Sequence, residues 1–592
     1  MTAETAGPAW AGSGGFMRKL RGRMELRHML LLAVVLAAVI TPLLFLVLGS
    51  FSSARLPGEF TLRTLTFANH IKVWSDPGTY AVFSNTVIYV VGSTALGLSL
   101  AILLAWLVER TDIPGKLWIY AAVPMTLAMP GMLQAMAWVL MLSPKIGFLN
   151  KAAMDLFGLT TAPINIYSLG GMIFIEGLRL VPTAFLMLVP LLKSMDPALE
   201  EAAAMSGASN TRTLRKITVR LLLPGLVAVT IYQFITALEV FEVPGILGLP
   251  SGIYVFSTKI YAVLHSTSFL PNYGEANALA VLYLVIAIGA TLAYGRVIAV
   301  SERFSIVTGK GYRPRLQPLG RWRYLAIALV ILYLLFSVIL PTLVLAYISF
   351  MPFLQTPTLE AMSRFTLDNY RTVFTTDRME TVLWNTAVMV AVTSTATVAA
   401  SVVVSLVVVR SRFWGRKLLD QLVFMPHAIP GIVIGLAALW VFLKVDKLGF
   451  SLFGTVWSVC IVFTIGFMSY GTRAMNAAIL QIHKDLEEAA QTSGATQWRV
   501  MRRVFMPLLM PALVGVWIWT ALHAVRMAGQ PLILVEGESN ELLAVTIWNL
   551  WTEGQAVIVG AIGTMMILAL LALTLLLRWL TARSGPRAQG AH

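Results

Sequence analysis

Long uninterrupted runs of apolar residues constrain this chain more than any other feature of its sequence. The first run, Met29–Leu48, has 20 residues and no charged side chain. About 20 apolar residues are enough for a helix to cross the hydrocarbon core of a bilayer. Similar runs recur to the end of the sequence, and only 12% of all residues are charged, about half the fraction found in soluble domains. We therefore predict an all-α membrane protein.

A basic segment precedes the first apolar run, and secretory signals share this arrangement. Five Lys and Arg residues lie between Arg18 and Arg27. The apolar part of a signal has only about 7–15 residues, however, so this run is too long. We expect a retained first span with a cytoplasmic N-terminus.

Twelve membrane spans are expected, in two sets of six. The first set falls near residues 29–50, 81–108, 117–142, 168–192, 221–241 and 277–300, and the second near 324–350, 383–409, 419–443, 454–475, 507–527 and 556–577. An even number of spans places both termini on one side of the membrane.

The distribution of basic residues predicts the orientation of these spans. The segments on the side of the two termini hold 30 of the 44 Lys and Arg residues. Basic loops are retained in the cytoplasm, so we expect both termini to be cytoplasmic. Basic loops that face anionic lipid also explain the formal net charge of +16. A lipid bilayer is therefore the expected partner, and nucleic acid is not.

The sequence contains two copies of one unit. The segment Glu200–Ser209 closely resembles Glu487–Thr496, at an offset of 287 residues. Further upstream, Asn85 matches Asn385 at an offset of 300. The difference between the offsets is an insertion in the first copy, expected in the outer loop 143–167. Because each copy has an even number of spans, the two six-helix repeats are predicted to lie parallel to each other.

This duplication divides the chain into five parts. They are a cytoplasmic N-terminal tail (1–28), a first repeat (29–300) with a cytoplasmic loop at 193–220, a cytoplasmic linker (301–323), a second repeat (324–580) with the matching loop at 476–506, and a cytoplasmic C-terminal tail (581–592).

The repeated loop segment has the composition of a short helix with a small surface. Glu and Ala favour helices, and Glu suits a helix N-terminus. A glycine that follows allows a sharp turn or a close backbone approach. Such a helix is suited to dock in a groove of another protein. The residues concerned are Glu200, Glu201, Ala202, Ala203 and Gly207, and Glu487, Glu488, Ala489, Ala490 and Gly494.

This segment resembles the Glu-Ala-Ala-x-x-x-Gly signature of binding-protein-dependent ABC importer permeases. The Leu-Pro pair that follows in that family is matched by Leu223-Pro224, whereas the second copy has Met506-Pro507 and Met510-Pro511. The resemblance covers nearly the whole chain after the N-terminal tail. It implies the type I ABC importer permease fold and a segment that enters a cleft on an ATPase subunit.

The resemblance also implies partners. No Gly-x-x-x-x-Gly-Lys-Ser/Thr phosphate loop occurs in the sequence. ATP and Mg²⁺ are therefore expected on separate ABC ATPase subunits, in two copies for the two docking segments. An external solute-binding protein is the other implied partner. The chain itself is expected to be a transport subunit without a cofactor and without catalytic residues.

Charged residues within the spans are candidates for functional sites. Glu176 and Arg179 are three residues apart, so they are expected to pair on one helix face. Glu239 and Arg526 are related by the offset of 287, and we expect them to lie near each other across the pathway. Together with Glu242 and Gln530 they are the candidate pathway or gate residues. A structural or gating pair and direct contact with the solute both remain open.

No metal site or catalytic cluster is predicted. The chain has one cysteine and seven histidines, and none of them has the spacing of metal ligands. An ion-coupled secondary transporter fits twelve spans equally well, but it has no need of a duplicated docking segment.

The solute is the most open question. Two repeats in one chain, with phrases such as Ala137-Trp138 and Met195-Asp196-Pro197, resemble the ferric-iron permease group and also thiamine permeases. Ferric iron is therefore the first expectation, with thiamine, polyamine or phosphonate as alternatives. The family implies a bacterial inner membrane.

Overall fold

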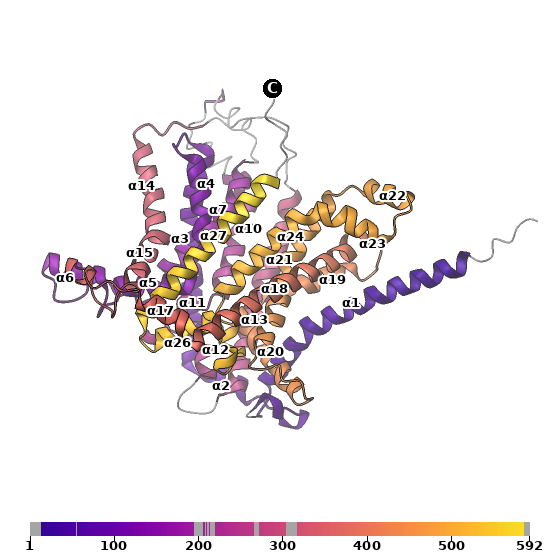
Figure 1. The fold of residues 1–592 in the computed structure, drawn as a ribbon, viewed down its shortest axis with the longest axis horizontal. Helices are drawn as coiled ribbons and strands as arrows, with labels where there is room; N and C mark the ends of the chain where they lie inside the picture. The colour runs from indigo at the N-terminus through magenta and orange to yellow at the C-terminus, as the bar shows by residue number, and fades with distance from the viewer. Residues whose placement is uncertain are drawn as a thin grey trace, which may run out of the picture.

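The computed structural model describes residues 13–54, 56–193, 205–207, 209, 212, 219–265, 271–303 and 316–584. Over these ranges the chain is helical, and its only extended pairings are three isolated bridges. Long helices run through the molecule, and short helices lie near their ends (Figure 1). The prediction of an all-α membrane protein is confirmed.

The first repeat begins with a long helix that carries the first span. Its helices are α1 (Ser13–Ser50), α2 (Ala68–Ser75), α3 (Pro77–Arg110), α4 (Lys116–Met125), α5 (Gly131–Leu142), α6 (Phe148–Phe157), α7 (Leu169–Lys193), α10 (Val219–Glu239), α11 (Glu242–Leu247), α12 (Phe256–Leu264) and α13 (Tyr273–Arg303).

The second repeat begins with two helices joined by a π-helical turn. Its helices are α14 (Trp322–Leu334), α15 (Leu340–Ser349), α16 (Leu359–Met362), α17 (Asp368–Thr375), α18 (Asp377–Arg410), α19 (Arg416–Phe424), α20 (Gly431–Asp446), α21 (Val456–Gln481), α22 (Lys484–Thr492), α23 (Gln497–Val500), α24 (Met506–Arg526), α25 (Pro531–Leu534), α26 (Leu543–Thr552) and α27 (Ala556–Ser584).

Bent helices make the membrane spans less regular than the sequence suggested. Within the described ranges, nine helices are long and apolar enough to cross a bilayer, and three bent pairs raise the number to as many as twelve. Two of the expected spans, 117–142 and 419–443, are such pairs, bent by 91° between α4 and α5 and by 111° between α19 and α20. The third pair, α11 and α12, lies in a segment expected to be an outer loop.

A proline causes each of the two equivalent bends. Met129 and Ile429 precede Pro130 and Pro430, and their ψ angles are 117° and 122°. A proline ring disfavours the helical conformation of the residue before it. The chain therefore becomes extended there, and the proline starts a new helix in a different direction.

Hydrogen bonds repeat in the two halves at the offsets found in the sequence. The Oγ1 atom of Thr86 accepts a hydrogen bond from the backbone N of Phe256 at 3.0 Å, and Thr386 accepts the same bond from Leu543 at 2.9 Å. The two threonines are 300 residues apart, and the two donors are 287 apart. The duplication is therefore a duplication of structure.

The main helix pair of each repeat is closely packed because small residues lie between the helices. Between α3 and α7, a Cβ atom on Gly97 would lie 2.7 Å from the carbonyl oxygen of Gly177. Between α18 and α21, a Cβ atom on Gly471 would lie 2.2 Å from Oγ of Ser401. Small residues allow helices to approach each other closely in a membrane. Each repeat therefore contains one closely packed helix pair, α3 with α7 and α18 with α21.

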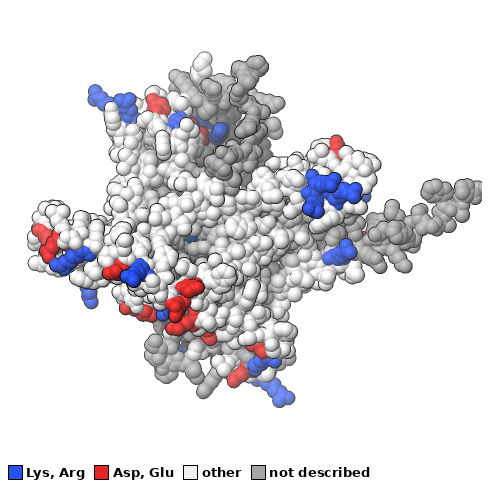
Figure 2. Space-filling view, viewed as in Figure 1, with Lys and Arg blue, Asp and Glu red and all other residues white. Residues whose placement is uncertain are grey.

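The two ends of the molecule differ in charge. Figure 1 places α22 and α23 at one end, and α2, α12 and α26 at the other. Lys and Arg gather near α23, and Asp and Glu gather near α26 (Figure 2). The exposed acidic residues there include Glu538 and Glu553.

Candidate functional site

A polar cavity of about 250 Å³ lies between the two repeats. Helices α5, α7, α10 and α11 of the first repeat and α20, α21 and α24 of the second form its wall. Every intramembrane or pathway residue proposed from the sequence therefore lines one cavity. The titratable and amide side chains on the wall are Gln134, Glu176, Arg179, Tyr232, Glu239, Glu242, His427, His523, Arg526 and Gln530.

The last residues of α10 and α24, which are equivalent helices of the two repeats, line the cavity. Helix α10 ends at Glu239, and α24 ends at Arg526, which is 287 residues later. Pro244 and Pro531, also 287 residues apart, lie in the short helices that follow. Proline has no N–H group for the helical ladder, so it favours a new short helix over continuation of the long one. The side chains of Glu239 and Arg526 at the two helix ends line the cavity between the repeats.

Several hydrogen bonds cross from one repeat to the other beside this cavity, and one of them runs from Nε2 of Gln134 to the carbonyl oxygen of Ser337 at 3.0 Å. Nη1 of Arg526 donates to the carbonyl oxygen of Leu127, and the backbone N of Ala528 donates to Oε1 of Glu242 at 3.2 Å. Glu239 and Arg526 line the same cavity, but none of the ion pairs among the described residues joins them. In this conformation Arg526 is held by a carbonyl group, and Glu242 is the acid that bridges the halves.

An ion pair between Glu176 and Arg179 lies on the same wall. Oε2 of Glu176 is 3.1 Å from Nε of Arg179, and Glu176 is fully buried. The guanidinium group packs against the bend before α5, where a Cβ atom on Gly131 would lie 1.5 Å from Nη1 of Arg179. At the equivalent bend, a Cβ atom on Gly431 would lie 2.4 Å from Nε2 of Gln530. Each bend therefore has a glycine that leaves room for a polar cavity side chain.

The charges on the cavity wall are not symmetric between the repeats. All three glutamates on the wall come from the first repeat. The positions 287 residues after Glu176 and Arg179 are Phe463 and Gly466, which also line the cavity. The second repeat contributes Arg526 and the two histidines. A solute in the cavity would therefore meet carboxylates mainly on one side.

Aromatic rings hold both histidines against the wall. His427 stacks on Tyr232 with ring centroids 5.9 Å apart, and His523 stacks on Trp519 at 3.9 Å. Among the described residues, no group of three or more His, Cys, Asp or Glu side chains is placed to hold a metal ion.

The repeated Glu-Ala-Ala segment is described in full only in the second repeat. Glu487, Glu488, Ala489 and Ala490 lie on helix α22. Glu200, Glu201, Ala202 and Ala203 lie outside the described residues, whereas Gly207 is described and has a φ angle of +78°.

Gly494 ends α22 in the left-handed conformation. Its φ angle is +80°. The backbone N of Ala495 donates to the carbonyl oxygen of Ala490 at 3.0 Å, and the N of Gly494 donates to that of Gln491, also at 3.0 Å. These are the two hydrogen bonds of a Schellman motif, which a glycine completes without strain. A Cβ atom on Gly494 would meet no other atom, so the glycine serves the turn and not a close approach.

The surface around α22 is suited to a partner protein. Glu488 and Ala489 are exposed, and two large apolar side chains nearby are also exposed, Leu486 by 50% and Trp498 by 73%. Exposed apolar side chains of this size beside a small-surfaced helix are typical of protein interfaces. Ala490 faces inward and packs against a buried apolar cluster of the second repeat.

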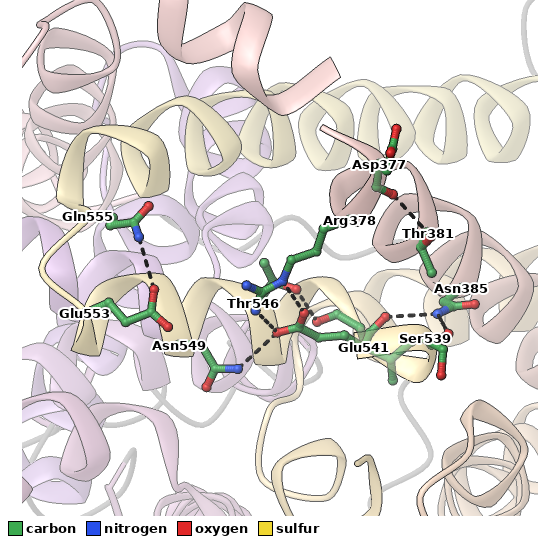
Figure 3. A network of polar contacts seen from close by, with 11 residues as sticks. Asp377, Arg378, Thr381, Asn385, Ser539, Glu541, Thr546, Asn549, Glu553 and Gln555 are labelled. Atoms are coloured by element: carbon green, nitrogen blue, oxygen red, sulfur yellow. Dashed lines mark hydrogen bonds and ion pairs between the residues drawn. The ribbon is translucent and has the colours of Figure 1, made fainter. Parts of the chain in front are cut away.

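Two further polar contacts were missed by the sequence analysis. Arg410 donates from Nη2 to carbonyl oxygens at the end of α21, and Arg378 forms a two-pronged ion pair with Glu541 (Figure 3). Arg410 does have a signal in the sequence, because Arg110 matches it at the offset of 300. Arg378 has none, because the matching residue is Gly78.

Two membrane-embedded repeats that share a cavity with charged side chains on its wall are the arrangement of a permease, a membrane transport protein. The family comparison is more specific. The family model described as "Binding-protein-dependent transport system inner membrane component" matches residues 97–304 and again residues 398–590. The chain belongs to this family, and it contains two copies of the family domain.

Several relatives are named for ferric transport. The ferric transport system permease protein FbpB of Actinobacillus pleuropneumoniae is 25% identical over 492 residues, which is 82% of this chain and 69% of the relative. The Fe(3+)-transport system permease protein FbpB 2 of Haemophilus influenzae is 19% identical over 491 residues, 82% of this chain and 87% of the relative. The spermidine/putrescine transport system permease protein PotC of the same species is 28% identical, but over only 30% of this chain and 66% of the relative.

One solved structure that aligns with this chain is of a bacterial ABC transporter for import of the acidic polysaccharide alginate. It aligns with 45% of this chain and 98% of its own, at 17% identity and a TM-score of 0.37.

Proposed function

We propose that this chain is the membrane subunit of an importer that receives ferric iron from an external binding protein and passes it to the cytoplasm. The observation that carries this proposal is the cavity of about 250 Å³, which the two copies of the family domain line together. A solute can pass between two halves that rock against each other only if both halves face it, and the cavity meets that condition.

Ferric iron is favoured over other solutes for two reasons. Relatives named for ferric transport align along 82% of this chain, whereas the polyamine relative aligns along 30%. The cavity also offers the carboxylates of Glu176, Glu239 and Glu242. Oxygen ligands of this kind suit hard, highly charged cations. The absence of a preformed cluster of three ligands among the described residues favours transient contact over tight binding.

Energy would come from ATPase subunits that dock on the cytoplasmic end. Helix α22 has the exposed small-surfaced face that such a docking needs. The two copies of the segment in the sequence suggest two ATPase subunits, one for each repeat. This chain would then move the solute without changing it chemically.

The basic end of the molecule would face the cytoplasm of a bacterial cell. Lys and Arg near α23 and in the loops around both termini support this orientation. The acidic end near α26 would then face the external binding protein.

Two of the hydrogen bonds that cross between the repeats would act as a gate. Arg526 to Leu127 and Ala528 to Glu242 join the halves on one side of the cavity. Both bonds must break when the halves separate there. The sequence predicted a gate made of two side chains, Glu239 and Arg526. The gate proposed here consists instead of contacts between a side chain of one repeat and the backbone of the other.

A co-purification experiment tests the proposal. The chain is solubilised from cells that express its neighbouring genes, and the ATPase activity of the bound proteins is measured. The control is a double variant, Gly207→Trp with Gly494→Trp. The proposal expects an ATPase with the unaltered chain and its loss from the double variant. Binding of ferric ion, thiamine and spermidine to a co-purified external protein then identifies the solute. An unaltered chain without an ATPase would contradict the proposal.

A further inference from the structure

The guanidinium group of Arg410 lies at the point where the chain leaves the membrane for the docking segment. Arg410 is the last residue of α18. Its Nη2 atom donates to the carbonyl oxygen of Ile479 at 3.0 Å and also to that of Ile482. Ile482 lies directly after α21 and two residues before α22 begins. Arg410 therefore holds the entry to the docking segment.

The same guanidinium group also reaches the exit of that segment. Its central carbon is 5.6 Å from the ring centroid of Phe505, a distance typical of a cation–π contact. Phe505 is only 3% exposed and ends a π-helical turn directly before α24. The Arg410 side chain therefore contacts both segments that connect α22 to the membrane helices, the one that follows α21 and the one that precedes α24.

The surroundings of Arg410 make this connection stiff. Ile479, Ile482 and Phe505 belong to one buried apolar cluster, against which Ala490 of α22 and Val409 of α18 are packed. Tightly packed side chains transmit displacement because they leave no free volume to absorb it. A push on α22 would therefore reach the end of α18 through this cluster and through Arg410.

The first repeat has the same contact. Arg110 is the last residue of α3, and its Nη2 atom donates to the carbonyl oxygen of Leu192 at 3.2 Å. Leu192 is 287 residues before Ile479, and it lies directly before the residues that lead to the first docking segment. Arg110 is 5% exposed. The contact is thus part of the duplicated unit and not a feature of one loop.

Helix α18 is also fixed at its other end. Nε and Nη2 of Arg378 are 2.8 and 3.0 Å from the carboxylate oxygens of Glu541 (Figure 3). Nδ2 of Asn385 donates to the carbonyl oxygens of Ser539 and Glu541 at 2.9 and 3.2 Å. With 34 residues, α18 is about 50 Å long. It is a single rod that connects the segment before α26 to the docking segment.

We propose that Arg410 is a positioning residue that couples movement of α22 to movement of α18, so that ATP hydrolysis by the partner drives opening of the cavity. This proposal rests on the proposed function, because it requires an ATPase on α22. The simpler alternative is that Arg410 only caps the carbonyl groups at the end of α21, a common stabilising contact. The two explanations differ in whether transport per ATP changes.

The test uses the full chain with its co-purified ATPase and binding protein in proteoliposomes. Arg410→Gln removes the charge, and Arg410→Lys keeps it but cannot donate to two carbonyl groups in the same fixed geometry. Arg412→Gln is the matched control, because Arg412 is exposed two residues further along the chain. ATP hydrolysis, ferric ion uptake and the melting temperature are measured for each variant.

The proposal expects the amount of ferric ion imported per ATP to fall about tenfold in Arg410→Gln, the order of effect of losing one charge-assisted hydrogen bond. ATPase binding should be retained, and Arg410→Lys should recover part of the loss. The control should match the unaltered chain. An unchanged ratio of uptake to hydrolysis in Arg410→Gln overturns the proposal, even if the melting temperature falls. If the unaltered chain binds no ATPase, the proposed function fails instead.

Discussion

Arg179 and Arg526 enter the cavity from opposite repeats, and oxygen atoms hold both. Glu176 lies 3.1 Å from Arg179, and the carbonyl group of Leu127 accepts a hydrogen bond from Arg526. Charged side chains at membrane depth are costly unless they are paired or face a polar cavity. Both conditions are met here, so these charges can remain in the membrane. Any change that displaces one of them should affect transport more than overall stability.

Gly131, directly after the bend between α4 and α5, should be essential for the position of the Arg179 guanidinium group. In Gly131→Ala the new methyl group would lie 1.5 Å from Nη1 of Arg179, so the guanidinium group must move away from Glu176. We expect a destabilisation of about 1–3 kcal/mol, the usual effect of overpacking, and a larger relative loss of solute uptake. The melting temperature and the uptake rate check this. Gly289→Ala is the control, because no atom lies near its added Cβ, and it should leave both quantities unchanged.

Arg526 should restrain the separation of the halves. Arg526→Gln removes the charged donor to Leu127, a bond worth about 1.5–3 kcal/mol when one partner is charged. We expect basal ATP hydrolysis, measured without the binding protein, to rise several-fold. Glu239→Gln should have a smaller effect, because Glu239 does not pair with Arg526 in this conformation. A basal rate that is equal in Arg526→Gln and in the unaltered chain would argue against the gate.

Some of these residue contacts could be predicted from the sequence and others could not. The spacing of Glu176 and Arg179 fixes them on one helix face, so their pairing follows from helix geometry alone. The contact of Arg526 with a carbonyl group depends on where the bend before Pro130 leaves Leu127. The sequence pattern of apolar runs carries no information on that direction.

At the scale of the elements, helix α22 and the glycine after it form the segment that we propose meets the ATPase. The sequence predicted this helix and its turn, because Glu, Ala and Gly each have strong local preferences. It did not predict the breaks in the spans 117–142 and 419–443, although Pro130 and Pro430 were visible there. An apolar run that contains a proline is compatible with a kinked helix as well as with two helices, and only tertiary packing decides between them.

Gly494 should control how well α22 is formed. In Gly494→Ala, a residue with a Cβ atom must adopt a φ angle near the +80° of the glycine, which costs about 1–2 kcal/mol. The Schellman turn should loosen, and the affinity for the ATPase should fall about 5- to 30-fold. Titration of the purified ATPase against the chain in nanodiscs measures this. Gly515→Ala in α24 is the control, since its Cβ would meet no atom, and it should bind normally. Normal binding by Gly494→Ala as well would contradict the role of the turn.

At the scale of the whole molecule, two copies of one helical unit enclose a cavity and differ in the charges that they place on its wall. The duplication explains why the bends, the helix ends and the arginines at the ends of α3 and α18 recur at fixed offsets. The repeats also differ, since Phe463 and Gly466 stand in place of Glu176 and Arg179. As a result, all three carboxylates on the cavity wall belong to the first repeat. Such an arrangement suits movement of the halves against each other around a polar solute.

The most direct test of this account is ferric ion uptake by proteoliposomes that contain the chain with its ATPase and binding protein, with ionophores present to remove all ion gradients. Because the proposed function couples solute passage to ATPase subunits on the docking segments, we predict that uptake continues with ATP and stops without it. Uptake that follows an imposed ion gradient and is independent of ATP would contradict the account and identify an ion-coupled carrier instead.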